Sequence, residues 1–145
     1  MNEKLKNRKL FIHRDAGIKK PQLGLVCKFI IFCARVLPIT GSFEIHIVSD
    51  RDASGISTTA AYHTGVGKIV VYGKNRALVD VMRSVAHEMV HMMQDEKGMI
   101  QGSIRDIGGF HENQANAGAG ALIKAFAKTI PGGEKIYESK KHRSV

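Results

Sequence analysis

The stretch NRALVDVMRSVAHEMVHMMQDEKG, residues 75–98, decides more about the fold than any other part of the chain. Its apolar residues recur at steps of three and four, the spacing that places side chains on one face of an α-helix. These residues are Leu78, Met82, Val85, Met89 and Met92. Asn75 is a suitable N-cap and Gly98 a suitable C-terminal stop. The stretch therefore predicts a helix that buries one face in the core.

Two histidines on this helix, His87 and His91, stand one turn apart and on a different side from the apolar residues. This spacing lets both imidazoles reach a single Zn²⁺ ion. Glu88 then flanks the metal, where its carboxylate suits a general base that takes a proton from a water polarised by zinc. The alternative is a buried helix that carries two histidines and a glutamate by chance.

A third zinc ligand is needed, because a catalytic zinc usually has three protein ligands and one open position. The downstream candidates are Asp95, Glu96, Asp106, His111 and Glu112. Glu112 is favoured because it lies in the first turn of a second predicted helix, residues 110–129. Asn116 follows one turn later and could hydrogen-bond a ligating histidine. Alanines and glycines between 115 and 121 would let the two helices approach closely. His111 remains the competing third ligand.

The rest of the chain predicts a single α+β domain over residues 1–145. An apolar stretch at 22–37 predicts a buried helix, and the alternation in FEIHIV, residues 43–48, predicts a strand. Two further strands, at 57–63 and 68–73, predict a hairpin. We expect a small, mainly antiparallel sheet packed on the N-terminal helix and on the histidine helix, with the glutamate-bearing helix after them.

The net charge of +9 is concentrated near the ends of the chain. Residues 1–20 carry seven lysines and arginines against two acidic residues, and the tail at 134–145 is also rich in lysine. We interpret both as solvated, flexible segments. The alternative interpretation is an electrostatic surface for nucleic acid or another acidic partner.

Nothing in the sequence indicates a membrane segment or secretion. The longest apolar run, residues 23–39, is interrupted by Lys28 and Arg35 and is too short to span a bilayer. No cleavage site of a signal peptide follows it. Cys27 and Cys33 have neither a metal-pair nor a disulfide-scaffold spacing, so we expect free thiols in a reducing compartment. The expected location is the cytoplasm.

HEMVH at 87–91, followed by ENQAN at 112–116, resembles the zinc sites of gluzincin metallopeptidases. The resemblance covers roughly residues 57–129 and is to minimal single-domain forms from phages, mobile elements and bacteria. It implies a zincin-like fold and peptide-bond hydrolysis. It also implies Zn²⁺ ligation by His87, His91 and Glu112. The supporting residue four positions after the ligand glutamate is usually Asp in that family, and here it is Asn116.

The same resemblance implies that residues 58–63 form an edge strand that pairs with an extended peptide substrate. An ordinary hairpin is the alternative for this segment. Candidates for stabilising an oxyanion are Tyr62, His63 and His111. Two other functions stay open: a zincin-fold accessory protein of phage type without useful turnover, and a basic, DNA-associated protease that resembles the SprT-like proteases, in which His111 would be the third ligand.

Overall fold

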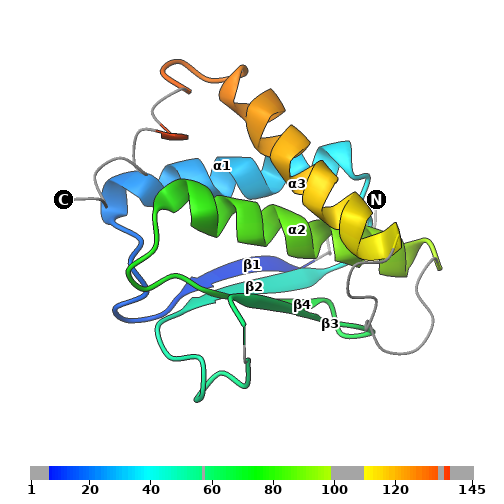
Figure 1. The fold of residues 1–145 in the computed structure, drawn as a ribbon, viewed down its shortest axis with the longest axis horizontal. Coiled ribbons are helices and arrows are strands. Elements are labelled where there is room, and N and C mark those ends of the chain that lie inside the picture. Colours follow the sequence, from blue (N-terminus) through cyan, green and yellow to red (C-terminus); the bar gives the residue numbers. More distant parts are fainter. Residues whose placement is uncertain (1–6, 57, 99–109, 134–135, 138–145) are drawn as a thin grey trace.

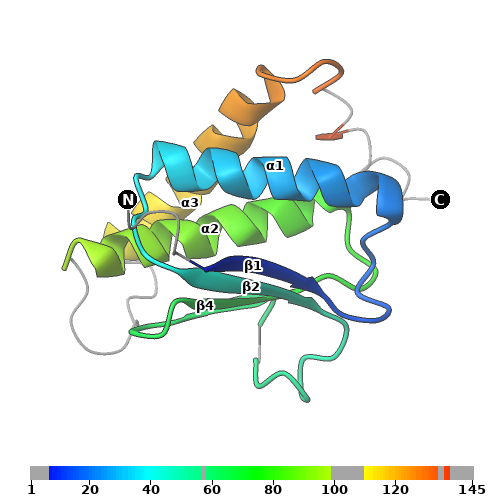
Figure 2. The same cartoon turned by 180° about the vertical axis from the view of Figure 1, so that it is seen from behind.

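A four-stranded sheet carries all three described helices on one face (Figures 1 and 2). The computed structural model describes residues 7–56, 58–98, 110–133 and 136–137. In chain order, its elements are β1 (Arg8–Ile12), α1 (Lys20–Val36), β2 (Phe43–Val48), β3 (Ala60–His63), β4 (Lys68–Tyr72), α2 (Leu78–Glu96) and α3 (Phe110–Ala127). The α+β class is thus confirmed.

The sheet is mixed, with strand order β1-β2-β4-β3. β1 pairs with β2 in parallel, β2 pairs with β4 in parallel, and only β3 and β4 are antiparallel. The expectation of a mainly antiparallel sheet is therefore wrong. The physical reason is α1, which carries the chain back over the sheet between β1 and β2 and so returns β2 in the same direction. The predicted β3–β4 hairpin is confirmed.

β1 lies inside the basic segment that we expected to be flexible. Its side chains alternate, because Leu10 and Ile12 pack against the main core while Phe11 stacks on His46. The alternation is short and has basic residues on both sides, so it gives only a weak strand signal in the sequence. At the other end of the chain, Ile136 is buried in the core, and 134–135 and 138–145 lie outside the described residues.

The main core lies between the sheet and the helices. β2 contributes Ile45 and Ile47, both fully buried, and α2 contributes the apolar stripe that the sequence predicts. The opposite face of the sheet carries a smaller apolar cluster of Val48, Ile56 and Val70. Within the described residues, no helix combines the length and apolar character needed to cross a bilayer.

The predicted helices are present, but α2 begins later than expected. Asn75 has a φ of 60° and is not the N-cap, which is Ala77. Arg76 stabilises the start of α2 instead, because its guanidinium donates to the carbonyl oxygens of Tyr72 and Asp80 and to the Ser84 hydroxyl. Gly98, with a φ of 72°, follows the helix end as predicted.

The two cysteines should differ sharply in reactivity. Cys33 is fully buried and burial raises the pKa of its thiol, whereas Cys27 is partly exposed. We expect a thiol reagent to titrate one cysteine in the native protein and both after denaturation. Replacement of Cys27 by Ser should abolish the native reaction. Two rapidly reacting thiols in the native protein would contradict this packing of α1.

Candidate metal centre

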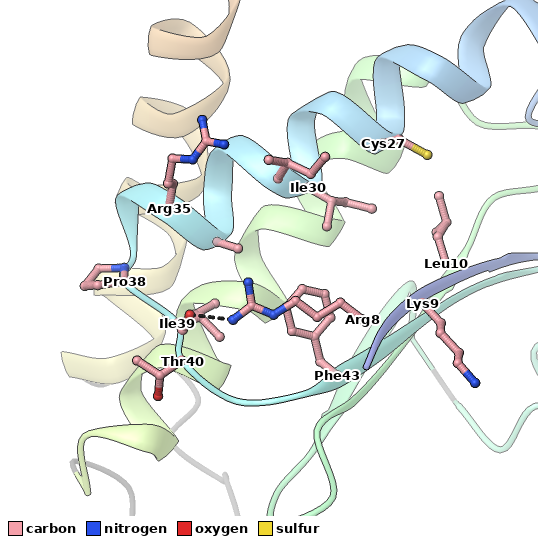
Figure 3. Close-up of a pocket in the computed structure, with 12 residues that line it drawn as sticks. Arg8, Lys9, Leu10, Cys27, Ile30, Arg35, Pro38, Ile39, Thr40 and Phe43 are labelled. Carbon is pink, nitrogen blue, oxygen red and sulfur yellow. Dashed lines mark hydrogen bonds between the residues drawn. The ribbon is translucent and has the colours of Figure 1, made fainter. Parts of the chain in front are cut away.

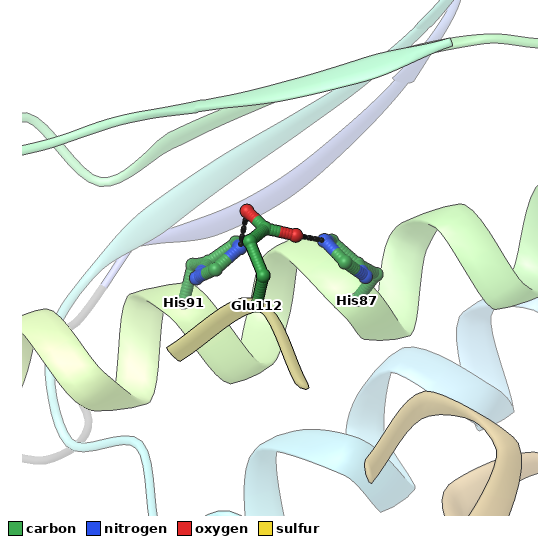
Figure 4. A group of neighbouring side chains, drawn as sticks. All are labelled: His87, His91 and Glu112. Atoms are coloured by element: carbon green, nitrogen blue, oxygen red, sulfur yellow. Dashed lines mark hydrogen bonds and ion pairs between the residues drawn. The ribbon is translucent and has the colours of Figure 1, made fainter. Parts of the chain in front are cut away.

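Three side chains from two helices meet at one point above the sheet (Figure 4). His87 Nε2 lies 3.1 Å from Glu112 Oε1, and His91 Nε2 lies 3.0 Å from Glu112 Oε2. The ligand atoms of the three residues all lie within 4.8 Å of one another. The histidines come from α2 and the carboxylate from the first turn of α3, as the spacing of HEMVH and ENQAN predicts.

Small residues on α3 make this meeting possible. Ala115 and Ala119 are buried in the core between the helices. Gly118 is the tightest position, because a Cβ atom there would lie 3.1 Å from the Val90 side chain. α3 therefore packs on α2 with little side-chain bulk between them, and this close approach brings Glu112 to the histidines.

His91 is held by a buried amide that the sequence analysis did not identify. Its Nδ1 lies 2.8 Å from Gln94 Oε1, and Gln94 Nε2 in turn donates to Gln114 Oε1 at 2.6 Å. Because the amide oxygen can only accept, Nδ1–H donates to Gln94, and this bond fixes the ring so that Nε2 faces Glu112 Oε2. The signal in the sequence was a polar residue three positions after a ligand candidate, on the same helix.

His87 occupies the more open side of the group. Burial, and then the neighbouring His91, hold the pKa of His87 below its ordinary value, although Glu112 and a hydrogen bond with Asn116 oppose the shift. Its contact with Glu112 has the length of an ion pair, but the lowered pKa favours a neutral imidazole, the form that binds metal. The contact with Asn116 is the one expected from the sequence.

The donor set fits a zinc ion. Tetrahedral ligands at about 2.0–2.1 Å from Zn²⁺ lie roughly 3.3 Å from one another. Here each histidine nitrogen lies about that far from a different oxygen of Glu112, and one donor atom from each residue lies within 4.8 Å of the other two. Each Nε2 faces one oxygen of Glu112, and a carboxylate oxygen can only accept, so a proton or a cation must lie between each nitrogen and its oxygen. Nitrogen and carboxylate oxygen are both ordinary zinc ligands. His87, His91 and Glu112 can thus hold a metal ion.

Glu88 lies beside this group and is nearly buried, with 8% of its surface exposed. Burial, and then the negative charge of Glu112, raise the pKa of Glu88 to about 8. Glu88, His87 and Glu112 all line one cleft of about 620 Å³. Thr58 and Thr59, which precede β3, and Ala60, its first residue, form another part of its wall. β3 is an edge strand, as expected.

Tyr62 and His63 do not line the cleft. The Tyr62 hydroxyl donates to Asp95 Oδ2 at 2.6 Å, away from the cleft lining. His63 is exposed and, by strand alternation, points to the opposite face of the sheet from Tyr62. His111 lies in the first turn of α3, but its side chain is outside the described part of the structure.

Two of the other downstream ligand candidates, Asp95 and Glu96, have hydrogen-bond partners of their own. Asp95 accepts hydrogen bonds from Tyr62 and from the Gly65 amide. The Glu96 carboxylate accepts from the backbone amides of Thr40 and Gly41, which fixes the end of α2 to the turn before β2. Asp106 lies outside the described residues.

Removal of the Gln94 amide should weaken metal binding although Gln94 is not a ligand. We expect Gln94→Ala to raise the zinc dissociation constant about 10- to 100-fold, because His91 loses the partner that fixes its ring. Competition with a chromophoric chelator measures this. Asn113→Ala, at an exposed position next to Glu112, is the matched control and should bind zinc like the wild type. Equal affinities for both variants would contradict the role of Gln94.

The helix contact can be tested with two glycines of α3. Gly118→Leu should separate α3 from α2, lower the melting temperature and weaken zinc binding, because a Cβ there already presses on Val90. Gly120→Leu adds the same side chain where no atom lies within 4 Å of the new Cβ. It should keep zinc affinity and stability, or gain up to about 1 kcal/mol from helix propensity. A Gly118 variant that binds zinc normally would refute the packing argument.

Comparison of the chain with protein-family models, with curated proteins and with solved structures gives no match.

Proposed function

We propose that this protein is a zinc-dependent metallopeptidase. The observation that supports the proposal most directly is the convergence of His87, His91 and Glu112, whose donor atoms lie within 4.8 Å of one another. Two further features support it. A buried carboxylate, Glu88, lines the same cleft, and so does the start of an edge strand. A chance pair of histidines on a helix requires none of these neighbours.

His87, His91 and Glu112 would hold the ion. A bound Zn²⁺ supplies Lewis-acid chemistry: it polarises water and the substrate carbonyl, and its charge lowers the pKa of nearby acids. Glu88 takes a proton from the attacking water as the water oxygen bonds to the carbonyl carbon. It then returns that proton to the amide nitrogen as the C–N bond breaks. Its burial keeps it from bulk water, so the proton stays within the cleft.

The substrate would lie along β3. Its first residue, Ala60, and the two residues before it line the cleft that contains Glu88 and His87. β3 pairs with β4 on one side and has the open edge of the sheet on the other. An extended peptide can add to such an edge through main-chain hydrogen bonds. The small Ala60 side chain leaves room for it.

The proposal predicts that Glu88→Gln keeps the metal and loses the activity. Elemental analysis should find one zinc per chain in the wild type and in Glu88→Gln, and none or much less in His87→Ala and Glu112→Ala. Cleavage of a quenched peptide library should fall about 10²- to 10⁴-fold in Glu88→Gln, because the general base is lost. Glu44→Gln, a carboxylate of β2 outside the cleft, is the matched control and should cleave normally.

Three outcomes would contradict the proposal. The first is a wild-type protein that binds no zinc even when zinc is added back. The second is Glu88→Gln with wild-type activity. The third is a zinc-loaded protein that cleaves no member of the library, which would favour an accessory protein without turnover.

A further inference from the structure

A second cavity, of about 650 Å³, lies between α1 and β1 (Figure 3). It is unrelated to the metal centre, because β1 forms the opposite edge of the sheet from β3. Its walls are largely apolar, with Leu10 on β1 and Ile30, Ile31 and Ala34 on α1. The volume is that of an ordinary ligand pocket.

The charge around this cavity has one sign. Arg8, Lys9 and Arg35 line it, and none of the described residues that line it is acidic. Arg8 is held in place, because its Nη2 donates to the Ile39 carbonyl oxygen at 2.7 Å and its Nε donates to that of Gly41 at 3.1 Å. Its guanidinium also lies 5.0 Å from the centre of the Phe43 ring. A guanidinium fixed in this way costs little further entropy when it meets an anion.

β1 offers a free backbone edge beside the cavity. The Asn7 carbonyl oxygen accepts from Phe43 and the His13 amide donates to Ile47, so odd-numbered residues direct their backbone groups toward β2. Because backbone groups alternate along a strand, those of Arg8, Leu10 and Ile12 point away from the sheet. Among the residues that the structure describes, none hydrogen-bonds to these outward groups.

We infer that this groove binds an extended, acidic segment of a partner protein, which adds as a strand along β1. Leu10 and Ile12 face the helices, so every second side chain of an added strand would also face them and enter the apolar cavity. Acidic side chains among those that face the helices would meet Arg8 and Arg35, whereas Lys9 lies on the other side of β1 (Figure 3). Main-chain pairing supplies affinity, and the cavity and the cations supply specificity.

Charge complementarity favours an acidic partner in this groove over the two ends of the protein's own chain. Residues 1–6 carry Lys4 and Lys6 against Glu3, and residues 138–145 are also net basic. Such segments would be repelled by the cations of the groove. A partner with the opposite charge is favoured, and the free strand edge favours a peptide over a small anionic amphiphile.

The probe is a fluorescein-labelled peptide of sequence Glu-Thr-Ile-Thr-Val-Thr-Glu, measured by fluorescence anisotropy; its glutamates share one face of the strand with Ile and Val. Glu88→Gln protein is used beside the wild type, so that cleavage of the probe at the metal centre cannot be mistaken for failure to bind. We expect saturable binding that weakens as salt rises. The same peptide with Lys in place of Glu should not bind. A peptide with alternate backbone nitrogens methylated should lose binding, because strand pairing is blocked.

Two matched pairs of variants locate the site. Arg35→Glu should weaken binding about fivefold or more, whereas Lys28→Glu, a charge reversal on the same helix outside the cavity, should not. Ile31→Asp should weaken binding about tenfold, because an apolar wall is lost. Val36→Asp is its control, since both side chains are 54% exposed and only Ile31 lines the cavity.

Several results would overturn the inference. The first is that the acidic probe does not bind. The second is that the methylated probe binds as tightly as the unmethylated one. The third is that each control variant loses as much affinity as the cavity variant it is paired with. Saturable binding of decanoate with no binding of the peptide would assign the cavity to an anionic amphiphile instead. None of these results bears on zinc content or on cleavage, so the metallopeptidase proposal is tested separately.

Discussion

α2 must satisfy two partners at once, and the rest of the structure depends on this constraint. One face of the helix supplies Met82, Val85 and Met89 to the core above the sheet. Another face presents His87 and His91 to Glu112 of α3. Because a helix is rigid over this length, the sheet side fixes the rotation of α2 and thereby fixes where the histidines point. The position of the candidate metal centre thus depends on the apolar packing between α2 and the sheet.

The two histidines have different surroundings, which suits a site with one closed and one open side. His91 is 2% exposed and is fixed through Gln94, whereas 19% of the His87 side chain is exposed and it lines the cleft. Glu112 spans them with one carboxylate oxygen on each. Solvent is therefore excluded on the His91 side of the group, and a molecule in the cleft can reach it from the His87 side. A catalytic metal site needs such an open position.

The sequence was most informative where one residue pattern had one physical meaning. Helical periodicity located α2, and the HEMVH and ENQAN spacing identified the three side chains that the structure brings together. The direction of the strands was not available from the same patterns, because alternation is identical in parallel and antiparallel pairs. β1 was missed because five residues among many cations carry too weak a signal. Gln94 was missed because its role depends on the ring orientation of His91.

The two ends of β3 are attached differently. Near one end, Tyr62 and Gly65 both hydrogen-bond Asp95, close to the last turn of α2. The other end, Thr58 to Ala60, lines the cleft near the middle of the same helix. Between these ends, β3 is paired with β4 from Ala60 to His63, so the strand cannot move by itself without breaking the ladder. On this side of the cleft, Thr58 is the lining residue that precedes the ladder, so its backbone can shift while the pairing of β3 with β4 stays intact.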